Sequence, residues 1–230
     1  MPIFQINNKK CLFIHIPKSG GSSIEKWLSQ LSSSSFFCKH MNFHLPCTPQ
    51  HFHAEIIENL FAEDYFDYIF TVCRNPFERL FSEYRYRLDL NHSKEEEILS
   101  FDIWCLQNLS KYEENHFHFD NHIRPQNEFL AFDCEVFYFE KGMQNVMREI
   151  SQRLDIPAPN QVFHEKKGSK IDITLDQKLI SQIYEFYKED FNAFGYDNSF
   201  CQDNVIIENT GIFQNVLDSV SIPPFSNRTD

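Results

Sequence analysis

One short segment limits the possible folds of this chain more than any other: His15-Ile16-Pro17-Lys18-Ser19-Gly20-Gly21-Ser22-Ser23. It follows an apolar run, 11–14, and precedes an amphipathic run that starts at Ile24. Adjacent glycines allow a tight turn and a close approach of backbone to ligand. A strand, a glycine loop and a helix in this order aim backbone N–H groups at one point. The segment therefore predicts an anion site at a helix N-terminus. It is not the usual ATP or GTP loop, because Lys18 precedes the glycines and G-x-x-x-x-G-K-[ST] is absent.

A second segment also predicts a strand that leads into a helix, with a candidate anion-binding residue between them. The apolar run 68–73 predicts a buried strand, and Arg74 follows it directly. Asn75-Pro76 is typical of a helix start, with Asn as N-cap and Pro at the first helical position. Open α/β sheets bind ligands at the carboxyl ends of their strands, so Arg74 is a candidate anion-binding residue.

Together the two segments resemble the phosphate motifs of the sulfotransferases, in the branch of heparan sulfate 2-O-sulfotransferase and bacterial glycan sulfotransferases. The loop is similar to I-P-K-[ST]-G-G-[ST]-S, and residues 74–84 are similar to R-[ND]-P-x-x-R-x-x-S-x-Y. The resemblance implies 3′-phosphoadenosine-5′-phosphosulfate (PAPS) as donor, adenosine 3′,5′-bisphosphate as product, and no required metal. It implies that Arg74 and Ser82 hold the 3′-phosphate, that Arg79 supports the loop through an ion pair, and that the 5′-phosphosulfate lies against Lys18, Ser19, Gly20, Gly21, Ser22 and Ser23.

The resemblance also suggests a base. His51 lies between the two motifs, in Gln50-His51-Phe52-His53-Ala54, where relatives carry a similar His-x-x-Ala. Sulfuryl transfer to a hydroxyl needs a proton acceptor, and imidazole titrates in the useful range. We expect His51 to be this base and Lys18 to stabilise the leaving phosphate, with His53 and His44 as alternatives for the base.

Further positions are candidates for binding the acceptor or the nucleotide of the donor. His122-Ile123-Arg124-Pro125-Gln126 is similar to a family segment, H-x-R-P-Q, near the acceptor cleft. His122 and Arg124 are therefore candidates for binding a carboxylate or sulfate on the acceptor, although capping and surface pairing explain them equally well. A metal at His116, His118 and His122 is not expected, since no adjacent motif completes a site. Lys166, Lys167 and Ser169 are candidates for covering the nucleotide, or they form a solvated basic turn.

The alternation of strands and helices predicts an α/β fold. We expect strands at 11–17, 68–73 and 134–140, and helices at 22–31, 52–62, 95–110, 124–130, 143–154 and 175–190. The resemblance implies a P-loop-like, three-layer α/β/α domain with a central parallel sheet over 1–196. Its closing segment, similar to Y-x-x-D-F-x-x-F-G-Y, is expected to be structural, and 197–230 is expected to be an arm or tail.

Bulk properties exclude some classes. A net charge of -12 argues against a general nucleic-acid binder. Seven cysteines without C-x-x-C favour reduced thiols, and the start of the chain lacks a signal-peptide pattern. With no run of 18 apolar residues, no membrane span is expected. We expect a cytoplasmic protein of the bacterial type, or a Golgi-lumenal one if the chain is a trimmed piece of an animal relative.

The predicted activity is transfer of a sulfuryl group from PAPS to a hydroxyl, most simply on a carbohydrate. Two alternatives remain open from the residues: a nucleotide-dependent kinase on a related scaffold, and a non-enzymatic protein that binds the nucleotide. The acceptor and the oligomeric state do not follow from the sequence.

Overall fold

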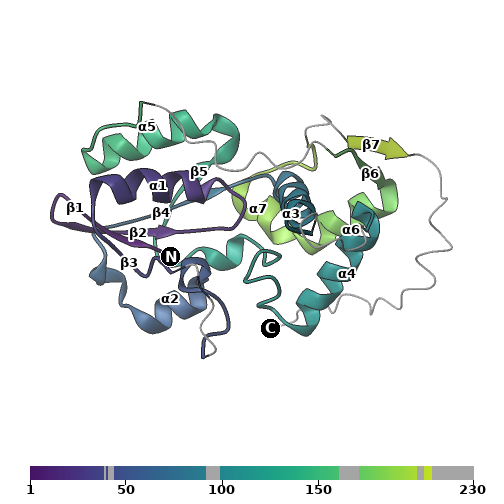
Figure 1. The fold of residues 1–230 in the computed structure, drawn as a ribbon, viewed down its shortest axis with the longest axis horizontal. Coiled ribbons are helices and arrows are strands. Elements are labelled where there is room, and N and C mark those ends of the chain that lie inside the picture. The colour runs from purple at the N-terminus through teal and green to yellow at the C-terminus, as the bar shows by residue number, and fades with distance from the viewer. Residues whose placement is uncertain (39, 41–43, 92–98, 161–170, 201–204, 209–230) are drawn as a thin grey trace.

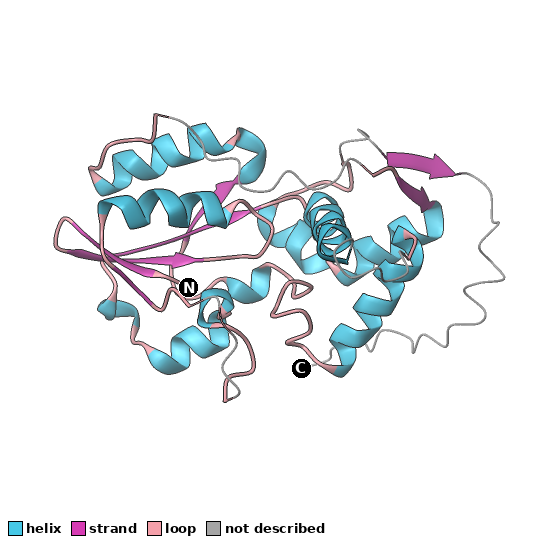
Figure 2. Cartoon of the chain, in the orientation of Figure 1, coloured by secondary structure: helices cyan, strands magenta, loops and turns pink. Residues whose placement is uncertain are grey.

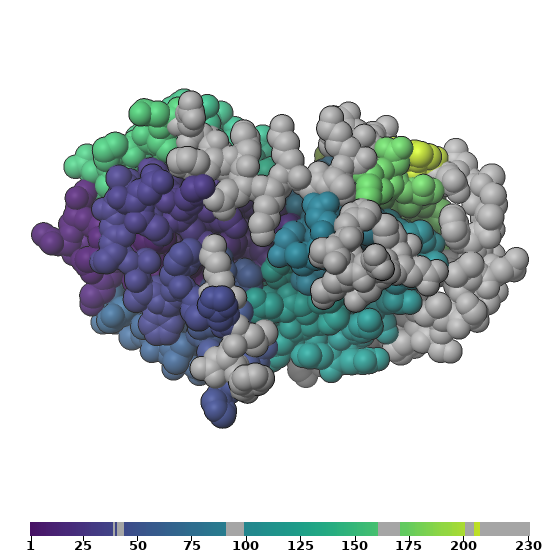
Figure 3. Space-filling view, viewed as in Figure 1, coloured from purple at the N-terminus to yellow at the C-terminus, as the bar shows by residue number. Residues whose placement is uncertain are grey.

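The computed structural model describes residues 1–38, 40, 44–91, 99–160, 171–200 and 205–208, and two parts lie side by side along its long axis (Figures 1 and 3). The first part contains a five-stranded sheet in the order β3-β1-β2-β4-β5. Its strands are β1 (Ile3–Ile6), β2 (Lys9–Ile14), β3 (Ser34–Ser35), β4 (Tyr68–Cys73) and β5 (Glu135–Tyr138). Strands β2, β4 and β5 are parallel, whereas β1 pairs antiparallel with β2 and β3. The α/β prediction is confirmed, but the sheet is mixed rather than wholly parallel.

Helices cover both faces of this sheet. On one face lie α1 (Gly21–Leu31) and α5 (Met143–Leu154), and on the other lies α2 (Ala54–Leu60) (Figure 1). Strand β4 is buried almost throughout, as a strand covered on both faces must be. Phe13, Trp27 and Phe70 belong to the core under α1 and α5, whereas Leu12 and Ile57 belong to the core on the face of α2. The core packing fixes the ends of β2 and β4, where the two predicted motifs begin.

The second part is mainly helical (Figure 2). It contains α3 (Pro76–Asn91), α4 (Phe101–Glu114), α6 (Gln177–Phe186), α7 (Lys188–Phe194) and a small parallel sheet of β6 (Ile173–Asp176) and β7 (Val205–Glu208). An aromatic cluster around Phe77, Phe81 and Phe101 forms its core. The helix start predicted at Asn75-Pro76 is confirmed, because Asn75 Oδ1 accepts the amide protons of Phe77 and Glu78 at 3.0 and 3.4 Å.

Several predicted boundaries were wrong. The segment 175–190 is not one helix, because the chain turns at Tyr187 between α6 and α7, and the Tyr187 hydroxyl donates to the carbonyl of Ile123 at 2.9 Å. Only a 3-10 turn, Asn127–Phe129, forms where we predicted a helix over 124–130. Asp190 accepts the amide protons of Gln126 and Asn127 there, at 2.8 Å each. Other 3-10 turns lie at Pro49–His51, Glu63–Tyr65 and Phe139–Lys141.

Two further observations concern the ends of the predicted domain. Within the expected arm or tail, β7 pairs with β6, and the Phe200 ring lies 4.8 Å from that of Phe77. Where the structure describes the chain, it contains no helix that is both long and apolar enough to cross a membrane.

Candidate active site

A cavity of about 530 Å³ lies where β2 and β4 end and the helical part begins. Eight of the residues predicted from sequence line it: Lys18, Gly20, Gly21, Ser22, His51, Arg74, Ser82 and His122. These residues come from segments up to a hundred positions apart. The fold therefore brings the anion loop, the arginine segment and the histidine together.

Both glycines of the loop are required by their surroundings. Gly20 has a φ of 88°, and a Cβ atom there would lie 2.7 Å from Met143 Sδ. At Gly21, a Cβ atom would lie 2.5 Å from the His15 ring. Helix α1 begins at Gly21, and no side chain caps this end among the described residues. The first amides of α1 thus face the cavity with the positive end of the helix dipole, a ready anion site.

The loop hydroxyls are not equivalent. Ser22 lines the cavity, whereas Ser19 is fully buried and donates from Oγ to the carbonyl of Ile16 at 2.6 Å. Ser23 is also buried, and its amide donates to the Gly20 carbonyl at 3.1 Å. Ser19 and Ser23 therefore do not line the cavity. The Ser19 hydroxyl instead stabilises the loop through its hydrogen bond to Ile16.

Lys18 has a left-handed backbone, with a φ of 68°, and its Nζ lies 4.0 Å from the centre of the Tyr86 ring. Both Lys18 and Tyr86 line the cavity. A cation over an aromatic face is held in position while remaining close to an incoming anion.

Arg74 has the most contacts of the candidate anion-binding residues. It stacks 4.5 Å from the Phe139 ring, its Nη1 donates to the Lys18 carbonyl at 3.3 Å, and its Nη2 lies 3.4 Å from Glu78 Oε2. Burial lowers the pKa of this guanidinium, which nevertheless stays charged. Its Nε is buried and has no partner among the described residues. Ser82, in the helix α3 that follows Arg74, also lines the cavity. A buried, unpartnered donor beside a cavity is what a bound phosphate satisfies.

The backbone of Arg74 is held by a relay of polar groups. Gln126 accepts the Arg74 amide proton at 3.0 Å and donates to the Arg74 carbonyl at 2.7 Å. Asp190 in turn binds the backbone of Gln126 and Asn127 at 2.8 Å each. Among the residues that the structure describes, Arg79 makes no ion pair of the kind that we expected. Instead it donates to the backbone carbonyls of His122 and Arg124, at 3.0 and 2.7 Å. The closing segment is thus connected to the anion site through Gln126, as a structural role requires.

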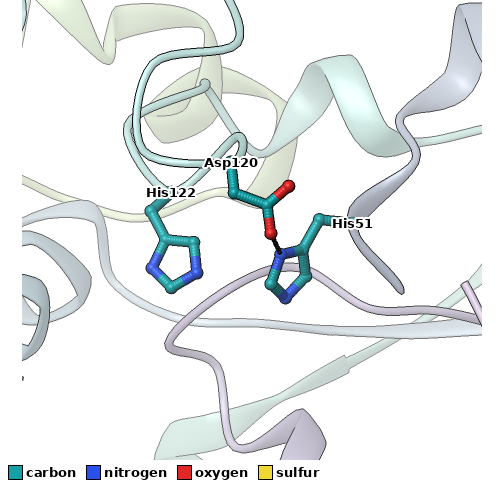
Figure 4. A group of neighbouring side chains, drawn as sticks. All are labelled: His51, Asp120 and His122. Carbon is teal, nitrogen blue, oxygen red and sulfur yellow. Dashed lines mark hydrogen bonds and ion pairs between the residues drawn. The ribbon is translucent and has the colours of Figure 1, made fainter. Parts of the chain in front are cut away.

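His51 lines the cavity, with Asp120 beside it (Figure 4). His51 Nδ1 lies 2.7 Å from Asp120 Oδ2, and Thr48 binds the same carboxylate through its amide at 2.5 Å and its hydroxyl at 2.7 Å. Burial lowers the pKa of His51, while hydrogen bonds from His51 and Thr48 outweigh burial and lower the pKa of Asp120. The pair therefore consists of a neutral imidazole that donates from Nδ1 and an ionised carboxylate. This arrangement leaves Nε2 as a proton acceptor.

Two further histidine–carboxylate pairs, His122–Glu83 and His15–Glu25, flank the His51–Asp120 pair. His122 Nδ1 lies 2.7 Å from Glu83 Oε2, and Arg87 Nε donates to the other oxygen at 2.6 Å. Burial lowers the pKa of His122. Burial alone would raise the pKa of Glu83, but His122, Arg87 and Lys18 together hold it below its ordinary value.

The second flanking pair is His15 with Glu25. His15 Nδ1 lies 2.5 Å from Glu25 Oε1, and Gln50 Nε2 donates to the same oxygen at 2.8 Å. The ring of His51 lies between those of His15 and His122, with centroids 5.1 and 4.9 Å away.

The remaining predicted residues lie elsewhere. Arg124 is buried outside the cavity lining, where its guanidinium binds Asn121, Glu128 and His116. The ring of His53 packs against Phe117 and does not line the cavity, and neither does His44. His116 and His118 stack on Tyr112 and Phe119 and do not converge with His122. Lys166, Lys167 and Ser169 lie outside the described residues.

Sequence reasoning missed Asp120, Glu83, Glu25 and Arg87. Three successive residues, Phe119, Asp120 and Asn121, have φ between 53° and 66°. Non-glycine residues with positive φ carry strain that tends to occur at functional sites, and Asp and Asn tolerate it best. The Asp-Asn pair in a polar, histidine-rich stretch was the available signal. Nothing in the sequence links it to His51.

This cavity combines a helix N-terminus, the cations Lys18, Arg74 and Arg87, and a buried imidazole with a carboxylate behind it, and the comparison with known families agrees with its chemistry. The model of the sulfotransferase family matches residues 2–197, so the chain belongs to the sulfotransferase family. No match was found among curated proteins or among solved structures.

Proposed function

We propose that this protein transfers a sulfuryl group from PAPS to a hydroxyl group of a glycan. The observation that carries this proposal is the convergence of three elements on one cavity: the glycine loop, Arg74 with Ser82, and the His51–Asp120 pair. The glycine loop suits a 5′-phosphosulfate, and Arg74 with Ser82 suits a 3′-phosphate. The His51–Asp120 pair suits the attacking hydroxyl, which has to lose a proton. Family membership supports sulfuryl transfer in general.

In this mechanism, His51 Nε2 accepts the proton of the acceptor hydroxyl as its oxygen attacks sulfur. The bond between sulfur and the bridging oxygen of the 5′-phosphate breaks, and adenosine 3′,5′-bisphosphate leaves. Lys18 and the first amides of α1 stabilise the negative charge that develops on the leaving phosphate. Asp120 keeps the proton of the neutral His51 ring on Nδ1 and stabilises the imidazolium that forms.

The nucleoside end of the donor has a place beyond Arg74. A second cavity of about 570 Å³ shares Arg74 and Phe139 with the first and is also lined by Tyr196 and Phe200. Aromatic side chains suit a purine, and Arg74 at the boundary suits the 3′-phosphate. Lys166, Lys167 and Ser169 remain candidates for covering this nucleotide. We propose no metal requirement for the transfer itself.

The donor is tested by thermal unfolding with nucleotides. Adenosine 3′,5′-bisphosphate should raise the melting temperature far more than ADP at equal concentration, because only the former offers a 3′-phosphate to Arg74 and Ser82. The shift should persist when magnesium is chelated. Equal shifts, or a shift that needs magnesium, would favour the alternative of a nucleotide-dependent kinase.

The base is tested by a pair of histidine variants. His51→Ala should abolish transfer from labelled PAPS in an acceptor screen while leaving bisphosphate affinity nearly unchanged. His53→Ala is the matched control, since His53 is also buried but its ring lies outside the cavity. If His53→Ala is inactive and His51→Ala active, the base is misassigned. If the wild type binds bisphosphate but transfers to no acceptor, the non-enzymatic alternative holds.

A further inference from the structure

Three side chains in the cavity converge in a way that proton transfer alone does not require. One ring nitrogen of His51, one ring nitrogen of His122 and one carboxylate oxygen of Asp120 lie within 4.8 Å of one another. Figure 4 shows the three groups facing one another across a small gap. Two imidazoles and one carboxylate form a ligand set that zinc and other divalent transition metals accept.

The three groups are already held close to a ligating arrangement. Thr48 holds Asp120 through its amide and hydroxyl, and Glu83 holds the His122 ring through Nδ1. Zinc bonds of about 2.0 Å place tetrahedral ligand atoms about 3.3 Å apart, so side-chain shifts of about 1 Å complete the site. A carboxylate behind a histidine is also the usual support of a metal-binding imidazole.

The charges in the cavity are compatible with a bound cation. An imidazole binds a metal in its neutral form, through a ring nitrogen that carries no proton. The cations Lys18, Arg74 and Arg87 line the cavity. Arg74 is paired with Glu78, and the carboxylates of Asp120 and Glu83 offset the charges of the other two. The cavity is wide enough for water to fill the remaining coordination positions.

We propose that His51, Asp120 and His122 bind one divalent transition metal ion, with Zn²⁺ as the best match to this ligand set. The metal takes the place of the proton between His51 Nδ1 and Asp120, and the single ring proton moves to Nε2, so no proton is lost overall. In that tautomer His51 cannot accept a proton from an acceptor hydroxyl. Binding of the metal is independent of the proposed reaction, whereas inhibition by the metal rests on it.

Binding is tested by calorimetry with Zn²⁺ and by absorption with Co²⁺ on the full chain. We expect one ion per chain in the wild type, and about a hundredfold weaker binding for His51→Ala and for His122→Ala. Two matched controls should bind as the wild type does: His53→Ala, which removes a buried histidine outside the cavity, and Cys38→Ser, which removes an exposed thiol. Unchanged binding in His51→Ala, or no saturable binding in the wild type, would overturn the proposal.

Two measurements on the wild type avoid any folding defect of the variants. X-ray absorption of the zinc complex should show imidazole nitrogen and carboxylate oxygen without sulfur, and a sulfur shell would contradict the site. Nitrogen NMR should show the His51 proton moving from Nδ1 to Nε2 on addition of Zn²⁺, and an unchanged tautomer would also contradict it. These results do not depend on activity. If the metal binds as proposed but no acceptor is ever sulfated, only the proposed function fails.

Discussion

At the scale of single residues, the acid–base chemistry of His51 is set by its environment. The sequence suggested an imidazole that titrates in the ordinary range, but burial lowers its pKa and Asp120 fixes its proton on Nδ1. The proposed base is therefore neutral at neutral pH. Such a group responds to a change in its hydrogen-bond partner more than to a change in the pH of the assay.

Asp120→Asn is expected to lower turnover by about a hundredfold while changing the affinity for adenosine 3′,5′-bisphosphate little, because the amide no longer fixes the tautomer of His51. In the wild type, kcat/KM should stay level through the usual imidazole range, near pH 6.5, and fall only well below it. Glu55→Gln is the control, since Glu55 is an exposed carboxylate beside His53. A wild-type profile that falls near pH 6.5 would contradict this environment of the base.

Lys18→Ala should lower turnover by about a hundredfold or more, because a positioned charge at the leaving phosphate is lost. Lys10 offers a matched control, since its Nζ lies 3.9 Å from the centre of the Tyr65 ring, as Lys18 Nζ lies 4.0 Å from that of Tyr86. Lys10→Ala removes an equivalent cation–aromatic contact away from the cavity and should keep full activity. Turnover is measured with labelled donor, and equal activities of the two variants would make the Lys18 contact merely structural.

Residues within one local motif could be predicted from the sequence. The placement of Lys18, Gly20, Gly21, Ser22, Arg74 and Ser82 follows from a strand, a turn and a helix start, whose signals lie within a few positions. Asp120, Glu83 and Glu25 could not be assigned to their histidines. The pairs of Asp120 with His51 and of Glu83 with His122 join segments 69 and 39 positions apart, whose approach depends on the whole fold. Glu25 lies only ten positions after His15, but no motif signal marks it as its partner.

At the scale of elements, helix α7 supports the proposed anion site through one side chain, that of Gln126. Gln126 lies between Asp190 of α7 and Arg74 at the end of β4, and it satisfies the amide and the carbonyl of Arg74. Strand β4, a continuous apolar run, was predicted to the residue, and β2 and β5 were predicted with bounds that differ by up to three residues. Strands β1, β3, β6 and β7 and the break at Tyr187 were not predicted. Short strands and helix breaks are decided by tertiary contacts rather than by local pattern.

Gln126→Ala should weaken bisphosphate binding by about tenfold, because two buried backbone groups of Arg74 lose their partners and the guanidinium loses its fixed position. Asn108→Ala is a matched control: Asn108 is also a buried amide that binds backbone, in α4 and outside the cavity. Both variants should lose stability, measured by thermal unfolding. Only Gln126→Ala should lose affinity in calorimetry, and equal affinities would remove Gln126 from the support of the anion site.

At the scale of the whole molecule, stability should fall as the pH is lowered from neutral. Burial lowers the pKa of four histidines, His51, His53, His118 and His122, with that of His118 lowered to about 4. In the unfolded chain these rings take up protons near pH 6.5, whereas in the folded protein they do so only at lower pH. The unfolded state thus binds more protons in this window, so unfolding becomes easier as the pH falls through it.

Asp190 acts in the opposite direction, because burial raises its pKa to about 6 and the folded state binds its proton more readily. The four histidines outweigh Asp190, and we expect the melting temperature to drop by about 5 °C or more from about pH 7.5 to about pH 5.

The His118→Gln variant should show a smaller drop without loss of transfer. His118 lies outside the cavity and donates from Nε2 to Asn108 Oδ1 at 2.7 Å. Scanning calorimetry at several pH values measures both effects. A melting temperature that stays level or rises toward pH 5 would mean that the buried histidines are protonated in the folded protein, and the neutral base assigned to His51 would then have to be abandoned.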